Sequence, residues 1–95
     1  MLFIVTGMFR ADADPQPAAL QAQFNDHLEQ TVPRIRLAGY LRDEDHRRIG
    51  FMGVVEADSY DLAEAFLRDS PYQRAGLYER IVSAEFDVEV GRLDR

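Results

Sequence analysis

The chain has 95 residues, 46% of them hydrophobic, which predicts one small folded domain spanning residues 1–95. Its formal net charge is −6 and no basic stripe is visible, so nucleic acid and anionic membranes are poor partners. It has no cysteine, which excludes disulfides, thiol nucleophiles and cysteine-based metal sites.

The N-terminal stretch MLFIVTGMFRADA lacks the basic start of a secretory signal. No apolar run approaches the roughly 18 residues of a membrane span. We therefore expect residues 2–5, Leu-Phe-Ile-Val, to form a buried strand of a cytoplasmic protein.

Helical and strand patterns alternate along the chain. Residues 18–32 have helical period, and a second helix begins at Asp58 or Ser59 and runs through Leu67. The order strand, helix, strand, strand, helix, strand predicts an α+β, ferredoxin-like βαββαβ domain with a four-stranded antiparallel sheet. The four strands are expected at residues 2–5, 35–41, 49–56 and 78–90.

Two helices can cover only one face of a four-stranded sheet. The first and third strands are nevertheless apolar in both phases, so the second face also needs cover. A second copy of the sheet is the simplest cover, which predicts a homodimer.

The stretch SPYQRAG at residues 70–76 predicts a short capped helix. Ser70 suits the N-cap, with Pro71 at the first helical position and the Gln73 side chain reaching back to the Ser70 amide. Gly76 suits the left-handed position that ends a helix. Tyr72 either packs in the core or lines a pocket. On the pocket alternative, Ser70 and Tyr72 are the candidate substrate-binding residues.

The stretch DSYDLAEAFLRDSPYQRAGLYERIVSAEFDV resembles the C-terminal half of YciI-like proteins, above all in Pro-Tyr-x-x-Ala-Gly-Leu. NDHLEQ and LAGYLRDEDHRRIG resemble the N-terminal half more loosely. The resemblance implies a dimeric α/β barrel with a His–Asp active site, which by position is His27 and Asp43. It also implies small-molecule chemistry, since one branch of the family dehydrochlorinates an aromatic compound.

The chain departs from the family pattern at three positions. Phe24 stands where the family often has arginine, Tyr40 replaces the proline of Gly-Pro, and Ser70 replaces the aspartate of Asp-Pro. These departures leave a divergent or inactive site open. Because aspartate and serine both cap helices well, Ser70 does not by itself indicate lost chemistry.

His27 falls within the apolar stripe of the first helix, so its ring should face the sheet. It is either a general base tuned by an acidic neighbour or a core histidine bonded to a backbone carbonyl. Asp43 either orients that imidazole or binds backbone in a turn, with Asp45 as a substitute. His46 lies in a charged hairpin tip that reads as a solvated loop, and no histidine spacing indicates a metal site.

The leading interpretation is a YciI-like, cofactor-free acid/base enzyme of lyase or isomerase type that acts on a small organic molecule. His27 would be the base and Asp43 its orienting partner. One alternative is a non-catalytic dimeric domain that binds a small ligand or a protein. The other is a barrel that resembles cofactor-independent monooxygenases.

Overall fold

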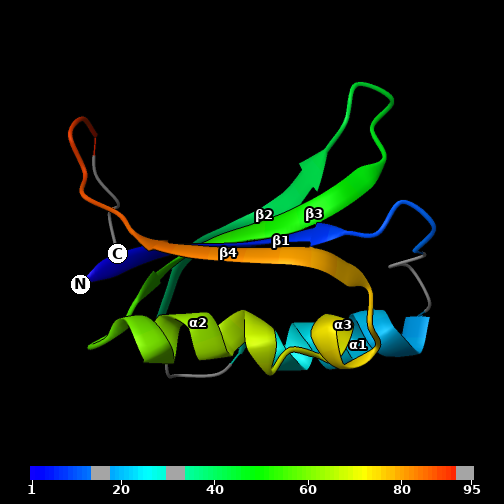
Figure 1. The fold of residues 1–95 in the computed structure, drawn as a ribbon, viewed down its shortest axis with the longest axis horizontal. Helices are drawn as coiled ribbons and strands as arrows, with labels where there is room; N and C mark the ends of the chain where they lie inside the picture. Colours follow the sequence, from blue (N-terminus) through cyan, green and yellow to red (C-terminus); the bar gives the residue numbers. More distant parts are fainter. Residues whose placement is uncertain (14–17, 30–33, 92–95) are drawn as a thin grey trace.

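The computed structural model describes residues 1–13, 18–29 and 34–91, which form a four-stranded antiparallel sheet with helices on one face (Figure 1). The strands run in the order β2-β3-β1-β4, so the first strand of the chain is central. This is the expected α+β, ferredoxin-like arrangement. The elements are β1 (Leu2–Phe9), α1 (Ala18–Leu28), β2 (Arg34–Arg42), β3 (Arg48–Glu56), α2 (Tyr60–Arg68), α3 (Pro71–Arg74) and β4 (Tyr78–Glu85).

The first helix is shorter than its sequence period indicates. α1 ends at Leu28, followed by a turn at Glu29. Residues 30–32, which the period also assigns to this helix, lie outside the described residues. Within the described residues, no helix is long and apolar enough to cross a membrane.

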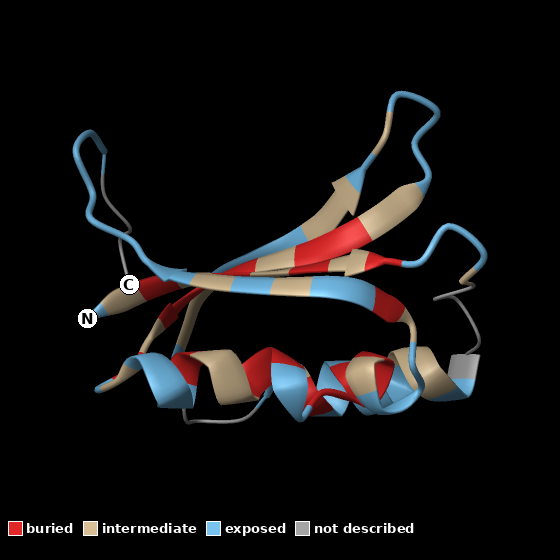
Figure 2. Cartoon of the chain, viewed as in Figure 1, coloured by how far each residue is buried: buried red, intermediate tan, exposed pale blue. Residues whose placement is uncertain are grey.

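The two faces of the sheet differ in burial. Along β1, every second residue is buried against the helices, including Phe3, Val5 and Phe9, while the residues between them are half-buried (Figure 2). Successive strand residues point to opposite faces, so the half-buried set lines the face without helices. On that open face Leu37 is 54% and Val82 42% exposed. The sheet therefore has one packed face and one apolar face that its own helices leave open.

The last strand is shorter than its alternating pattern predicts. β4 ends at Glu85 instead of Val90. β4 pairs with β1, which begins at Leu2, and the final backbone bond runs from the Phe86 amide to the Leu2 carbonyl at 2.9 Å. The expected boundary at Val90 is wrong because the neighbouring strand ends before the pattern does.

An aromatic layer fills the space between sheet and helices. The Phe9 and Tyr78 rings stack with centroids 5.2 Å apart. The Tyr78 ring also covers Gly7, because a Cβ atom at that glycine would lie 2.5–2.8 Å from three carbons of the ring. Glycine is required here by close packing, since Tyr78 is only 4% exposed and has little room to move.

We predict that Gly7→Ala lowers the free energy of unfolding by about 1–3 kcal/mol, the usual range for overpacking a core. Gly39→Ala is the matched control in the neighbouring part of the sheet, because no atom lies within 4 Å of a Cβ built there. Chemical denaturation of both variants provides the measurement. An equal loss of unfolding free energy in both variants would show that the Tyr78 ring does not restrict the side chain at position 7.

Candidate active site

His27 connects two helices. It lies in the last turn of α1 with only 6% of its surface exposed, and its ring stacks on Phe66 of α2 at a centroid distance of 4.7 Å. Its Nε2 atom lies 2.5 Å from the Phe66 carbonyl oxygen. Since a carbonyl only accepts hydrogen bonds, Nε2 carries the proton, and in the neutral ring the lone pair is on Nδ1. This contact is the one expected from the second alternative for His27, a core histidine that is hydrogen-bonded to a backbone carbonyl.

The Phe66 carbonyl is available to His27 because it belongs to the last turn of α2. Helix C-terminal carbonyls lack amide partners within the helix. The Ser70 amide, four residues further on, donates to Leu67 instead. His27 therefore supplies a side-chain donor to the end of α2, where the helix dipole favours a donor.

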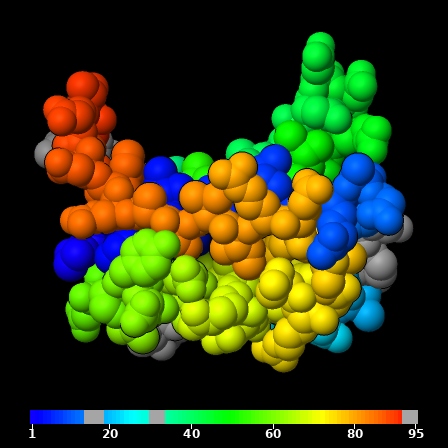
Figure 3. Space-filling view, in the orientation of Figure 1, coloured from blue at the N-terminus to red at the C-terminus, as the bar shows by residue number. Residues whose placement is uncertain are grey.

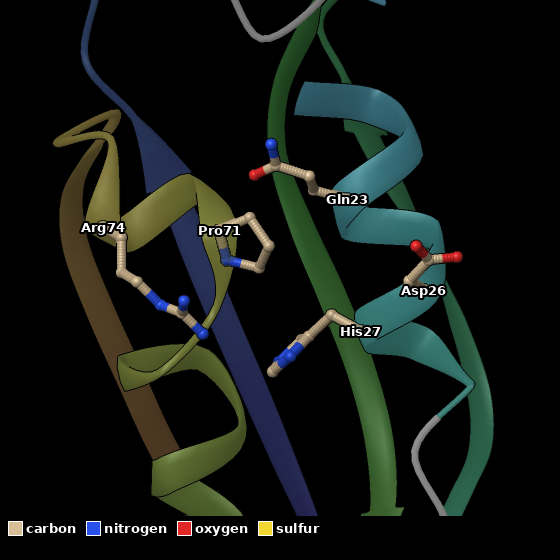
Figure 4. Close-up of a pocket in the computed structure, with 5 residues that line it drawn as sticks. All are labelled: Gln23, Asp26, His27, Pro71 and Arg74. Atoms are coloured by element: carbon tan, nitrogen blue, oxygen red, sulfur yellow. The ribbon is translucent and has the colours of Figure 1, made fainter. Parts of the chain in front are cut away.

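His27 also lines a cleft of about 390 Å³ between α1 and α3. Gln23 and Asp26 of α1 and Pro71 and Arg74 of α3 complete the lining. Figure 4 shows His27 and Arg74 reaching toward this space from opposite sides. The Nε and Nη2 atoms of Arg74 donate to the Asp69 carbonyl at 3.1 and 2.8 Å, which holds the guanidinium in place. The cleft thus combines an imidazole, a carboxylate and a guanidinium.

Asp43 lies at the tip of the β2–β3 hairpin. Its Oδ1 atom accepts from the amides of Asp45 and Arg47 at 2.9 and 3.0 Å, the backbone-binding role common for aspartate in turns. The hairpin rises on the side of the sheet opposite the helices, whereas His27 belongs to the helix layer (Figure 1). These contacts do not bring Asp43 to His27 within one chain, so their pairing stays a prediction.

The other hairpin residues share this turn. His46 is exposed with a φ angle of 65°, and Asp45 is also exposed. This agrees with the expectation of a solvated, charged tip for His46. Among the described residues, no group of three or more histidines and acids is placed to hold a metal ion.

Ser70 caps α3 as expected. Its Oγ atom accepts from the Gln73 amide at 3.3 Å, Pro71 follows at the first helical position, and Gly76 has a φ angle of 75°. The reciprocal half of the predicted capping box is absent, because the Ser70 amide donates to the Leu67 carbonyl at 3.1 Å. Ser70 and Tyr72 are both fully buried, so their predicted contact with substrate would require α3 to move.

A polar cluster around Tyr72 was not predicted. The Tyr72 hydroxyl lies 2.9 Å from that of Tyr40 and 3.4 Å from Oε1 of Gln21. Gln21 donates to Tyr40 at 3.0 Å and accepts from Arg48 at 2.8 Å. Arg48 also lies 4.0 Å above the centre of the Tyr40 ring. These residues are far apart in sequence, so no spacing signal could reveal them.

The Tyr72 phenol stays protonated mainly because it is buried. Burial raises the pKa of Tyr72 well above its ordinary value, and the bond to Tyr40 raises it further, while Arg48 lowers it. Tyr72 therefore remains a hydrogen-bond donor through the neutral pH range. The Tyr72 hydroxyl donates to Oε1 of Gln21 and is hydrogen-bonded to the Tyr40 hydroxyl, and these bonds position α3 and, through it, the cleft.

Comparison with known proteins shows the fold. No protein-family profile matches the chain, and no curated protein matches it in sequence. A similar solved structure is 5-chloro-2-hydroxyhydroquinone dehydrochlorinase (TftG) from Burkholderia phenoliruptrix AC1100, in complex with 2,5-dihydroxybenzoquinone. The two share 22% sequence identity, the alignment covers 92% of this chain and 94% of that chain, and the TM-score is 0.66. The chain therefore has the α+β, ferredoxin-like fold of that enzyme.

We predict that Ser70→Ala lowers the free energy of unfolding by about 1–2 kcal/mol, the upper part of the usual cost of removing an N-cap oxygen. Ser59→Ala is the matched control, since Ser59 caps α2 by accepting from the Leu62 amide at 3.2 Å. It should cost less, because water can reach that exposed amide and not the part-buried one of Gln73. Thermal unfolding of both variants shows which one loses more stability. A larger loss of stability for Ser59→Ala than for Ser70→Ala would contradict the prediction.

Proposed function

We propose that this chain is a YciI-like, cofactor-free acid/base enzyme of lyase or isomerase type, acting on a small organic molecule. The observation that carries the proposal is the cleft that the His27 imidazole lines together with Asp26 and Arg74. A histidine in a concave site with charged neighbours is a usual arrangement for proton transfer.

The contacts assign a role to each group in this cleft. His27 takes a proton from the bound molecule, with its ring held by the Phe66 carbonyl and the stacked Phe66 side chain. In this proposal the Phe66 carbonyl orients the ring, the role that the YciI-like resemblance implies for Asp43. Arg74 stabilises negative charge that develops on an oxygen or on a departing anion. In an isomerase the proton returns to another atom of the molecule, whereas in a lyase the leaving group departs with the bonding electrons.

The dehydrochlorinase of similar fold suggests which compounds to test. Its structure holds 2,5-dihydroxybenzoquinone, a small oxygenated ring. For this chain we propose the same broad class of compound, because a cleft of about 390 Å³ is large enough for one such ring and offers both signs of charge to its oxygens.

A second candidate function is a non-catalytic ligand-binding domain. It is favoured by the burial of His27 and its bond to the Phe66 carbonyl, which suit a structural residue. The two candidates differ in turnover. A binding domain would hold the ring compound in the cleft without releasing a product.

We predict that the protein binds 2,5-dihydroxybenzoquinone at the cleft and releases chloride from 5-chloro-2-hydroxyhydroquinone. His27→Gln should reduce turnover by about 10²–10⁴-fold, the usual contribution of a general base. The glutamine amide can still donate to the Phe66 carbonyl, so the fold is retained. Chloride release and NMR chemical-shift changes are the measurements.

The second histidine provides the control. His46→Asn changes the exposed histidine of the hairpin turn and should leave turnover unchanged, since asparagine tolerates its positive φ angle. Binding without turnover in the unmodified protein would favour the ligand-binding domain. Neither binding nor turnover would contradict both candidates for this class of compound.

Asp43→Asn tests the predicted His–Asp pair separately. Asparagine keeps the side-chain oxygen that accepts from the amides of Asp45 and Arg47, so the hairpin should persist while the charge is lost. The pair predicted from sequence requires turnover to fall toward the level of His27→Gln. Unchanged turnover would assign Asp43 to the turn alone.

We further propose that the protein works as a homodimer formed through the open face of the sheet. The support is the apolar surface there, with Leu37 and Val82 about half exposed. Light scattering at micromolar concentration should give about twice the 10.9 kDa mass of one chain. A monomer at millimolar concentration would contradict this proposal and leave the acid/base proposal intact.

A further inference from the structure

The end of α2 anchors both the imidazole and the guanidinium of the cleft. The Phe66 carbonyl is bonded to His27, and the Asp69 carbonyl, at the C-cap of the same helix, accepts from Nε and Nη2 of Arg74. Both carbonyls belong to a helix end, where carbonyls lack amide partners within the helix. One element therefore fixes the separation of two side chains that come from α1 and α3.

The bonds to Asp69 use only one edge of the Arg74 guanidinium. A guanidinium carries N–H donors on all three nitrogens in a planar fork, and here Nε and Nη2 share the single Asp69 carbonyl at 3.1 and 2.8 Å. Neither of the two ion pairs in the described part of the chain includes Arg74. The end formed by Nη1 and Nη2 is thus a pair of parallel donors whose positive charge has no acidic partner among the described residues.

The surroundings of Arg74 suit an anion on a small ring. Figure 4 shows Arg74 and His27 turned toward each other, with Pro71 beside the space between them. Pro71 is buried and is the apolar residue of the lining, and Gln23 adds a carboxamide. Asp26 lines the cleft from α1, and its carboxylate points away from Arg74 in Figure 4. Negative charge placed beside Arg74 therefore meets donors first and the acid last.

We propose that the cleft takes a small hydroxylated ring that carries a carboxylate, and that Nη1 and Nη2 of Arg74 hold this carboxylate. Two parallel N–H donors match the two oxygens of a carboxylate, which makes the contact directional as well as charged. The ring packs on Pro71, and its hydroxyl groups bond the Gln23 carboxamide. The inference rests on the proposed function and names the substrate class of the same site.

A carboxylate at Arg74 also fits the chemistry proposed for His27. When His27 removes a proton from an atom conjugated with the carboxylate, the electron pair left on the substrate spreads onto the two carboxylate oxygens. Arg74 stabilises this charge without moving, because its other edge stays bound to the Asp69 carbonyl. The end of α2 thereby sets which atom of the bound ring His27 can reach.

Matched ligands test the carboxylate on the unmodified protein. We expect 2,5-dihydroxybenzoate to bind at least about tenfold more tightly than hydroquinone, from which it differs only by the carboxylate. The neutral amide, 2,5-dihydroxybenzamide, keeps the shape without the charge and should bind within about threefold of hydroquinone. Isothermal titration calorimetry measures the three dissociation constants.

Two arginine variants test the paired donors. Arg74→Lys keeps the positive charge but removes the fork, so the preference for 2,5-dihydroxybenzoate over hydroquinone should fall to about threefold or less. Arg68→Lys is the matched control, because Arg68 lies in the last turn of α2 outside the cleft lining and a lysine there can still pair with Glu64. It should leave the preference unchanged, and circular dichroism checks that both variants fold.

The outcomes separate this inference from the proposed function. An amide that binds as tightly as the acid would overturn the carboxylate site, and so would the absence of binding by all three compounds. A preference that persists in Arg74→Lys would assign it to charge alone and overturn the paired contact. Chloride release judges the acid/base proposal separately, since that assay uses a compound without a carboxylate.

Discussion

The packing of Tyr72 between helices and sheet is the contact on which the rest of the structure depends. Its ring stacks on Phe24 at 4.2 Å and meets Phe9 edge-on at 5.3 Å. Its hydroxyl is held by Tyr40 at 2.9 Å. α3 has only four residues, too few to be stable alone, so this buried anchor decides where it lies. The position of Arg74 in the cleft follows from it.

The hydroxyl of Tyr72 makes the anchor specific as well as stable. A purely apolar core accepts many arrangements of similar energy, whereas a buried hydroxyl must find its partners in one geometry. Tyr40, Gln21 and Arg48 provide that geometry from a strand, a helix and the start of the next strand. One of the departures from the YciI-like pattern, Tyr40, is thus part of the framework that positions the cleft.

The two sides of the sheet differ in what they present. The helix side holds the cleft with His27 and Arg74 between α1 and α3. The open side is hollowed between the β2–β3 hairpin and the segment after β4 (Figure 3), and it carries the half-exposed Leu37 and Val82. The proposed acid/base cleft and the proposed interface therefore lie on opposite sides of the sheet.

Sequence alone determined the features that depend on local period and bonding. Alternation and helical period located the elements and hence the fold, and Ser70 and Gly76 marked the ends of α3, because a cap involves residues only three or four apart. Tertiary structure decided the rest. β4 ends where its neighbour does, His27 bonds a carbonyl 39 residues away, and Gln21 meets Tyr72 across 51 residues. Such contacts depend on how the layers pack, and no short stretch of sequence records that packing.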